Sequence, residues 1–246
     1  METSRSVKTR THPIGTSAKA TARGLLGAAL GFRDCRPETL DALIDAGHAR
    51  ALGKGELFLS QGEPFNMLCL VVEGSVEVSL LRHDGRRHLI SFLQPGDLVG
   101  LMCLIDGQGH VNDLRARHAT SVWLVPGDVV DRLRGQDPAL GQAFERQLVF
   151  RSRMLYERLS ADPSMPLDQR LARLLHLLSG LYGRPQDGAL QLDMKVSQAD
   201  LADWLGVSRQ RINFVIQQLE RDGLISLRYS AITITNPPGL ALRSKG

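Results

Sequence analysis

The chain has 246 residues, of which 43% are hydrophobic, and a formal net charge of +4, so it is long enough to form two domains with ordinary packed cores. No apolar run approaches the length that spans a bilayer, and the first residues lack the apolar core of a signal peptide, so we expect a cytoplasmic protein with no membrane partner. Three dispersed cysteines, the lack of an H-x-H or H-E-x-x-H pair, and the lack of a G-x-S-x-G elbow or Walker loop argue against disulfides, a metal site and catalysis, so we expect no enzyme and no cofactor.

The charge is distributed unevenly along the chain. Residues 1–23 carry five Lys/Arg and one acid, a net charge of +4, and residues 166–246 carry ten Lys/Arg and seven acids, a net charge of +3. Because the whole chain has a net charge of +4, the residues between these two segments have a net charge of −3. A positive excess outside the centre favours a polyphosphate partner such as nucleic acid. We expect residues 1–24 to be a basic, flexible N-terminal tail.

Residues 25–135 are expected to fold into a β-sandwich or rolled barrel. A short helix over Pro37 to Gly47 comes first, with a proline suited to its first turn. Short β-rich runs then recur between Leu57 and Val125, namely "LFLS", "MLCLVV", "SVEVSLL", "RHLISFL", "DLRAR" and "TSVWLV". Asp84-Gly85 is the strongest of the turn signals between these runs, and the others are Gly62-Glu63-Pro64, Glu73-Gly74 and Gln94-Pro95-Gly96-Asp97. Repeated short strands with such turns are typical of a rolled β architecture.

A single long helix is expected over residues 136–162. Asp137 can cap it, Pro138 suits its first turn, and no helix breaker follows before Asp162-Pro163. Roughly 24 helical residues span about 36 Å. A narrow apolar seam along one side suits pairing with a second copy of the chain, and the residues predicted for this dimer interface are Phe144, Leu148, Leu155 and Leu159. The alternative is that the seam packs on the β-roll of its own chain.

Residues 163–246 form the last predicted domain, which begins with a hinge marked by Pro163 and Pro166 and a helix over Leu167 to Tyr182. A helix-turn-helix follows. Ser197 caps a helix that ends at Leu205, with Asp200 at capping-box spacing, and Gly206 suits the sharp turn.

A second helix starts at Ser208, whose hydroxyl can cap it. One side of this helix is apolar and faces the core, with Ile212, Val215, Ile216 and Leu219. The opposite arc is available for contacts and carries Arg209 on its flank, then Gln210, Arg211, Asn213, Phe214, Gln217 and Arg221. Two alternating runs over residues 224–228 and 231–235 then read as a β-hairpin wing. A winged helix-turn-helix reads DNA by laying its second helix in the major groove. The alternative is a small helical bundle with a solvated polar face.

The order of these modules resembles the Crp/Fnr transcription regulators, the cyclic-AMP receptor protein family. The resemblance covers Leu25 to Thr235 and depends most on "GEPFNMLCLVVEGSVEV", "LQPGDLVG" and "SQADLADWLGVSRQRINFVIQQLERDGLI". It implies an α+β protein with an N-terminal cyclic-nucleotide-binding-like β-roll as effector or sensor domain, a long dimerisation helix and a C-terminal winged helix-turn-helix. A homodimer would then bind a palindromic site in double-stranded DNA, with RNA polymerase as a candidate partner.

The sequence departs from the family where its cyclic-AMP-binding members hold the nucleotide. Leu101 follows Gly100 in place of a glutamate, and His110-Val111, or Val111-Asn112 with another gap, replaces the Arg-Ser pair that holds the phosphate. Leu155 and Tyr156 replace the small hydroxyl pair of the long helix. A buried phosphate would lose several charge-assisted hydrogen bonds here. We therefore expect an effector other than cyclic AMP, of unknown identity, or none, at a pocket predicted to include Leu101, His110, Val111, Leu155 and Tyr156.

By the same resemblance, Arg209, Gln210 and Phe214 stand at the three base-reading positions. Arginine suits guanine, glutamine suits adenine, and phenylalanine can contact a thymine methyl. Contacts to the DNA backbone are assigned to two helix starts and two flanking side chains, namely Ser197, Ser208, Arg211 and Asn213. Two other classes stay open: a ligand-sensing adaptor whose winged helix binds a protein, and a cupin-type enzyme, which would require a His-rich metal motif that the chain lacks.

Overall fold

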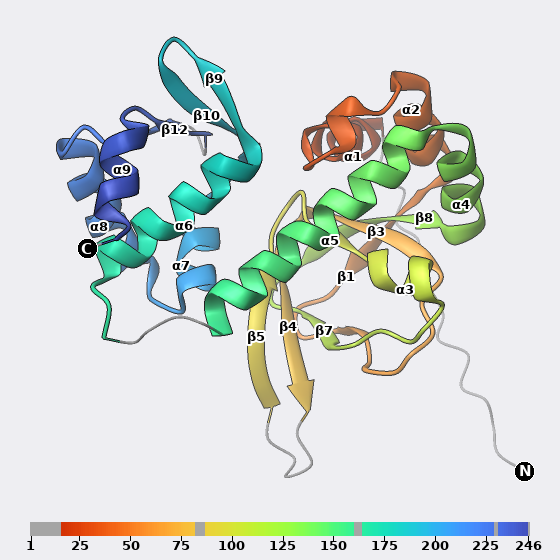
Figure 1. Cartoon of the computed structure of the whole chain (residues 1–246). Helices are drawn as coiled ribbons and strands as arrows, with labels where there is room; N and C mark the ends of the chain where they lie inside the picture. The colour runs from red at the N-terminus through yellow and green to blue at the C-terminus, as the bar shows by residue number, and fades with distance from the viewer. Residues whose placement is uncertain (1–15, 82–86, 160–163, 229–230, 246) are drawn as a thin grey trace, which may run out of the picture. The chain divides into compact units, whose positions relative to one another are not determined.

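The computed structural model describes residues 16–81, 87–159, 164–228 and 231–245 (Figure 1). The chain forms two compact units. The first runs up to Gly27 and from Asp34 to Gly141, and the second consists of Ala28–Arg33 and Gln142–Gly246. The mixed α+β architecture agrees with the sequence analysis.

The first unit is built around two antiparallel four-stranded sheets, with strand orders β1-β8-β3-β6 and β2-β7-β4-β5. The strands are β1 (His48–Leu52), β2 (Leu57–Leu59), β3 (Met67–Glu73), β4 (Val76–Leu81), β5 (Arg87–Leu93), β6 (Leu98–Val99), β7 (Asp113–Ala116) and β8 (Thr120–Pro126). All six β-rich runs of the sequence are strands, and β1 and β6 are additional. The predicted turn at Asp84-Gly85 lies outside the described residues.

Aliphatic and aromatic side chains fill the space between the two sheets. This core contains Leu52, Phe58, Leu59, Cys69, Val71, Val76, Val78, Val99, Leu114, Ala116, Val122 and Leu124. Because successive side chains of a strand point to opposite faces, the alternating pattern of β7 places Leu114 and Ala116 inside. The two sheets therefore form the rolled β-domain predicted from the sequence.

The helices of the first unit are α1 (Thr16–Ala28), α2 (Pro37–Ala46), α3 (Leu101–Asp106) and α4 (Gly127–Gln136), together with the start of α5 (Pro138–Leu159). The prediction of a flexible tail over 1–24 is wrong for residues 16–24, which form most of α1. Ala22 and Leu26 are fully buried, while Lys19 and Arg23 form ion pairs with Asp45 and Asp41 of α2. α1 and α2 lie side by side (Figure 1). The basic residues of this segment thus pair with a neighbouring helix. Residues 1–15 lie outside the described residues.

Asp137 joins the start of α5 to the start of α2. Its Oδ1 accepts a hydrogen bond from the backbone N–H of Ala139 at 3.2 Å, which confirms its capping role. Its Oδ2 accepts from the hydroxyl of Thr39 at 2.7 Å and from the N–H of Arg36 at 3.0 Å. Burial alone would raise the pKa of this carboxyl, but these three hydrogen bonds, together with the charge of Arg36, outweigh burial and lower it.

The second unit has a four-stranded antiparallel sheet of order β11-β12-β10-β9. Its elements are α6 (Leu167–Tyr182), β9 (Gly183–Gln186), β10 (Ala189–Lys195), α7 (Gln198–Leu205), α8 (Arg209–Arg221), β11 (Ile225–Arg228), β12 (Ala231–Ile234) and α9 (Pro237–Arg243), with η1 (Phe32–Asp34) beginning in its N-terminal segment. The predicted wing is the β11–β12 hairpin, in which Ile225 pairs with Ile234. The β9–β10 hairpin and α9 are additional. Of the predicted hinge, Pro163 lies outside the described residues and Pro166 is the N-cap of α6.

The second half of α5 packs within the second unit. Phe150 lies edge-to-face with Trp204 of α7, at 5.3 Å between ring centroids, and with Tyr182 of α6, at 5.7 Å. Met154 is part of the hydrophobic core formed with α6, α7 and α8. This part of the long helix is therefore joined to the helix-turn-helix by apolar packing.

The N-terminal segment Ala28–Arg33 covers α5 in the middle of the predicted dimer seam. Phe144 has no exposed surface and packs on Phe32, at 6.2 Å between ring centroids, and Gln147 Nε2 donates to the carbonyl of Leu30 at 3.0 Å. Phe144 is therefore not available to a partner, which corrects its assignment to the dimer interface. Nothing in the local sequence of this segment indicates that it covers Phe144.

Candidate nucleic-acid interface

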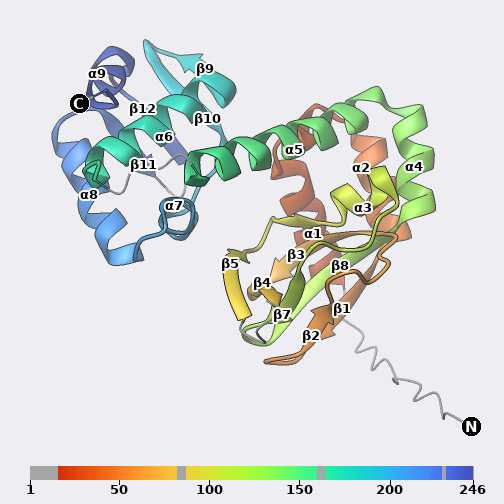
Figure 2. The same cartoon turned by 60° about the horizontal axis from the view of Figure 1, so that its bottom comes forward.

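The helix-turn-helix is fixed by two capped helices and a glycine turn. Ser197 and Asp200 form a reciprocal capping box, in which Asp200 Oδ2 accepts from the N–H of Ser197 at 2.7 Å and Ser197 Oγ accepts from the N–H of Asp200 at 3.2 Å. Gly206 adopts a left-handed conformation with φ of 67°, which glycine adopts without steric cost. Ser208 then caps α8 by accepting from the N–H of Arg211 at 3.4 Å. α7 and α8 lie side by side, as Figure 2 shows.

The inner side of α8 is buried as the sequence predicted. Its side chains are at most 6% exposed, and they are Ile212, Val215, Ile216 and Leu219. They pack on the inner side of α7 and on the wing in one continuous core. Because four consecutive inward positions are buried, the rotation of α8 about its own axis is fixed.

The outer side of α8 is exposed along its first two turns. Arg209, Gln210 and Arg211 are exposed, and the ring of Phe214 is 63% exposed. Leaving an aromatic side chain of this size in water is unfavourable in the free protein. The ring is therefore accessible to a partner.

Four residues are predicted to contact the DNA backbone. Ser197 and Ser208 are the N-caps of α7 and α8, and Arg211 and Asn213 lie in the first two turns of α8. Ser208 and Arg211 are exposed, while Ser197 and Asn213 are half-buried. Asn213 accepts a hydrogen bond at its Oδ1 from Gln198 Nε2 of α7, at 3.0 Å. Gln198 was not among the predicted site residues, and its position directly after the cap Ser197 was the signal that could have suggested it.

Charged side chains connect α6 and α9 to the two helices of the helix-turn-helix. Arg243 of α9 donates to Asp168 of α6 at 3.1 Å and to Asp222, the C-cap of α8, at 2.7 Å. The hydrogen bond that Arg243 donates to the Asp168 carboxylate is the main cause that raises the pKa of Arg243. Arg170 of α6 donates to the carbonyl of Leu205 at the end of α7, at 2.6 Å. These contacts connect α6 to the end of α7, and α9 to the end of α8 and to α6.

The predicted effector residues differ widely in exposure. In the roll, Leu101 and His110 are buried and Val111 is 47% exposed. His110 lies edge-to-face with Phe65, at 6.5 Å between ring centroids, and its Nδ1 lies 2.7 Å from the carbonyl oxygen of Asn112. Leu155 and Tyr156 belong to the second unit, where they are 56% and 69% exposed. Their grouping with the roll residues stays a prediction.

Gly100 fixes the backbone before Leu101. It has a φ of +92°, and a Cβ atom there would lie 2.1 Å from the carbonyl oxygen of Met67. Only glycine fits this close approach. The segment that starts α3 is therefore fixed against β3. Leu101, which follows Gly100, is apolar, whereas the cyclic-AMP-binding members of the Crp/Fnr family have a glutamate at this position.

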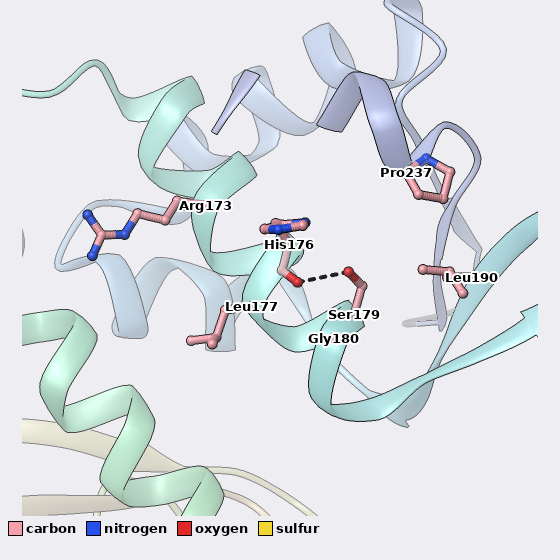
Figure 3. Close-up of a pocket in the computed structure, with 7 residues that line it drawn as sticks. All are labelled: Arg173, His176, Leu177, Ser179, Gly180, Leu190 and Pro237. Carbon is pink, nitrogen blue, oxygen red and sulfur yellow. Dashed lines mark hydrogen bonds between the residues drawn. The ribbon is translucent and has the colours of Figure 1, made fainter. Parts of the chain in front are cut away.

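A pocket of about 480 Å³ lies in the second unit (Figure 3). Its lining residues come from α6, β10 and α9, namely Arg173, His176, Leu177, Ser179, Gly180, Leu190 and Pro237. The hydroxyl of Ser179 turns to the carbonyl of His176, to which it donates at 2.8 Å (Figure 3). None of the five predicted effector residues lines this pocket, so it is not the effector site that the sequence suggested.

The side chains of the three cysteines, Cys35, Cys69 and Cys103, are buried. Burial raises the pKa of the Cys69 thiol far above neutral pH and also raises that of Cys103. Both therefore stay protonated and behave as small apolar side chains. Within the described ranges, no group of His, Cys, Asp and Glu side chains is arranged to hold a metal ion. Among these same residues, no helix has the length and apolarity needed to cross a membrane.

Models of two protein families match the N-terminal and the C-terminal parts of the chain. A model of the cyclic nucleotide-binding domain matches residues 49–137, and a model of the Crp-like helix-turn-helix domain matches residues 169–243. The anaerobic regulatory protein of Pasteurella multocida is 25% identical over 199 residues, which is 81% of this chain and 72% of that protein. The transcriptional activator protein anr of Pseudomonas aeruginosa is 28% identical over 77% of this chain and 76% of its own length.

A further relative and a solved structure match most of the chain. The CRP-like cAMP-activated global transcriptional regulator of Mycobacterium tuberculosis is 25% identical over 87% of this chain and 96% of that protein. A solved structure from Ruegeria pomeroyi, of a protein with provisionally assigned cyclic nucleotide binding, aligns over 93% of this chain and 99% of its own, with a TM-score of 0.52 and 17% identity. This likeness supports the order of the two folded domains.

Proposed function

We propose that this chain acts in the cytoplasm as a homodimer on a palindromic DNA site. The chain belongs to the Crp/Fnr family of DNA-binding transcription regulators. The observation that carries the proposal is the exposed arc of α8, with Arg209, Gln210 and Phe214 on a helix whose rotation is fixed by its buried side. Guanidinium and amide groups suit hydrogen bonds to base edges, and an exposed ring suits a methyl group. We assign no enzymatic activity to it.

The base contacts follow from the chemistry of the three side chains. Arg209 would donate two hydrogen bonds to O6 and N7 of a guanine, and Gln210 would pair with N6 and N7 of an adenine. Phe214 would lie on a thymine methyl and so remove its ring from water. Phosphate contacts would come from Ser208 and Arg211 at the start of α8, where the free N–H groups favour an anion. Ser197 and Asn213 would add contacts from α7 and from the side of α8.

The dimer would form along the exposed side of α5. Leu148 is half-buried and Leu155 is 56% exposed, and these residues are spaced by seven positions, as in a paired helix. Val149 and Tyr156 are also about half or more exposed. Phe144 is buried by its own chain, so we place the interface in the second half of α5. The side chain of Leu159 is outside what the structure describes.

The effector, if the β-roll binds one, would differ from cyclic AMP. Leu101 is buried where an acid would be required, and His110 or Val111 stands in place of the arginine that would hold the phosphate. An apolar molecule fits Leu101 and Val111 of the roll better than a phosphate does. RNA polymerase is the proposed protein partner of the DNA-bound form.

A selection of bound genomic fragments tests the proposal. The full chain is expected to enrich a palindromic sequence with two equal half-sites, and its affinity should fall steeply with salt because phosphate contacts release counterions. Repeating the selection with a small-molecule extract of cells tests for an effector. A protein that binds no duplex at low ionic strength but captures a protein partner would instead be an adaptor.

A further inference from the structure

The hydrogen bond between Gln198 and Asn213 connects the first turn of α7 to the second turn of α8. Gln198 is the first residue of α7, and its Nε2 donates to Oδ1 of Asn213 at 3.0 Å. Both side chains are half-buried, so water competes with this contact less than with a fully exposed one. We call these two side chains the amide bridge.

Asn213 lies on the same arc of α8 as the proposed base-reading residues. At about 100° per residue, its direction falls between those of Arg209 and Gln210, and it is three residues after one and four after the other. A side chain between two base readers faces the base edges too, and not only the phosphates at the flank. The amide bridge therefore controls a group directed at the groove.

In the orientation that the structure shows, the amide bridge turns the Oδ1 end of Asn213 toward Gln198. An unconstrained asparagine can turn over and offer either its oxygen or its nitrogen. Here Oδ1 is occupied by Gln198, so Nδ2, a donor, remains for the partner. In the major groove, guanine presents two acceptors and thymine one, whereas cytosine presents a donor.

We propose that Gln198 is a specificity-determining residue that acts through Asn213. It holds the Asn213 amide with its N–H groups outward, so that one base position in each half-site favours guanine or thymine over cytosine. Gln198 is then a positioning residue, and Asn213 makes the contact. This inference rests on the proposed DNA-binding function. It gives Asn213 a base contact in addition to the backbone contact proposed above, and so adds one base position to the three assigned there.

Replacing Gln198 by glutamate reverses the hydrogen bond and gives the sharpest test. A carboxylate only accepts, so Asn213 must donate to it and turn its oxygen outward. The preferred base at that position should change from guanine or thymine to cytosine or adenine, which carry donors. The fold should persist, since an acid in the first turn of a helix is favourable. Ala199→Glu is the matched control, because it adds the same charge to the same turn without touching Asn213's partner.

The measurement is a binding-site selection with the full-length wild type, Gln198→Glu and Ala199→Glu, followed by titrations on single-base variants of the selected site. Gln198→Glu is expected to change the preference at one position by about two- to tenfold, which is what one hydrogen bond is worth. Ala199→Glu should weaken binding to all sequences alike. If Gln198→Glu and Ala199→Glu select the same bases, the inference is wrong.

A double-mutant cycle separates positioning from direct contact. Gln198→Ala should relax the preference at that position in the wild type and have no further effect on it in an Asn213→Ala background. An equal effect of Gln198→Ala in both backgrounds would show that Gln198 reads the DNA itself, and would overturn the inference. A wild type that selects no sequence would refute the proposed function as well, whereas a selected site with an unaltered preference in Gln198→Glu refutes only this inference.

Discussion

Removing the buried carboxylate of Asp137 should destabilise the first unit by about 3 kcal/mol. The side chain is 4% exposed, and it accepts hydrogen bonds from the Thr39 hydroxyl and from the N–H groups of Arg36 and Ala139. In Asp137→Ala all three donors lose their acceptor, at roughly 1 kcal/mol each. The ion pair with Arg36 is 3.6 Å long and the Arg36 side chain is 59% exposed, so we count nothing for it.

The loss should also depend on pH with a defined sign. The hydrogen bonds lower the pKa of Asp137 in the folded state, so its contribution is present above the ordinary aspartate pKa of about 3.9 and is lost as the pH falls through the lowered value. The wild type and Asp137→Ala should therefore differ most at neutral pH and converge in acid.

Urea unfolding followed by fluorescence measures this difference. Trp123 is 5% exposed in β8 of the first unit, and a Trp204→Phe background leaves it as the reporter. Asp128→Ala is the control, since Asp128 is exposed on the neighbouring α4. A loss below about 1 kcal/mol, or a loss that is the same at pH 7 and pH 2, would refute the reasoning.

Three further changes test other parts of the structure. Leu155→Glu places a charge on the exposed seam of α5, and the chain should become monomeric by analytical ultracentrifugation without losing its fold; a dimer of unchanged stability would contradict the proposed interface. Arg243→Ala removes the contacts to Asp168 and Asp222 and should cost about 1–2 kcal/mol of stability in the second unit, because both pairs are partly exposed; a thermal melt of the DNA-binding unit that does not change would count against this connection. Gly206→Ala should cost about 1 kcal/mol for the left-handed conformation alone, since a Cβ there meets open space; a loss of several kcal/mol by denaturant titration would mean that the turn is sterically closed.

The regular part of the fold could be predicted because local and long-range requirements agree. The six β-rich runs are strands since their alternation matches the two faces of a sheet, and α8 begins after Ser208 since the cap and the buried stripe indicate the same start. The β9–β10 hairpin could also have been found, because its two-residue turn is Asp187-Gly188, a strong hairpin signal. The flanking segment "GRPQDGALQLDMK" carries no β-branched residue, so it lacks the composition typical of strands.

Other features depend on contacts that no local pattern contains. The buried side of α1 carries Ala22 and Leu26, which make only a short apolar stripe. Its Lys19 and Arg23 resemble those of a solvated tail until α2 supplies Asp45 and Asp41. Phe144 fits a dimer seam by spacing, but Phe32 covers it from more than a hundred positions away. Gln198 gains its role only when Asn213 is brought to it. For the proposed DNA surface, the residue types could thus be chosen from sequence, but not the partners that orient them.

The central claim is that the exposed arc of α8 reads base edges, and Arg209→Ala tests it most directly. A binding-site selection with this variant should lose preference for one guanine in each half-site, by about 5- to 150-fold, while other positions are retained. Its salt dependence should stay close to that of the wild type, because phosphate contacts are unaffected. An unchanged preference at every position, with Arg209 removed, would contradict the assignment of this helix to base recognition.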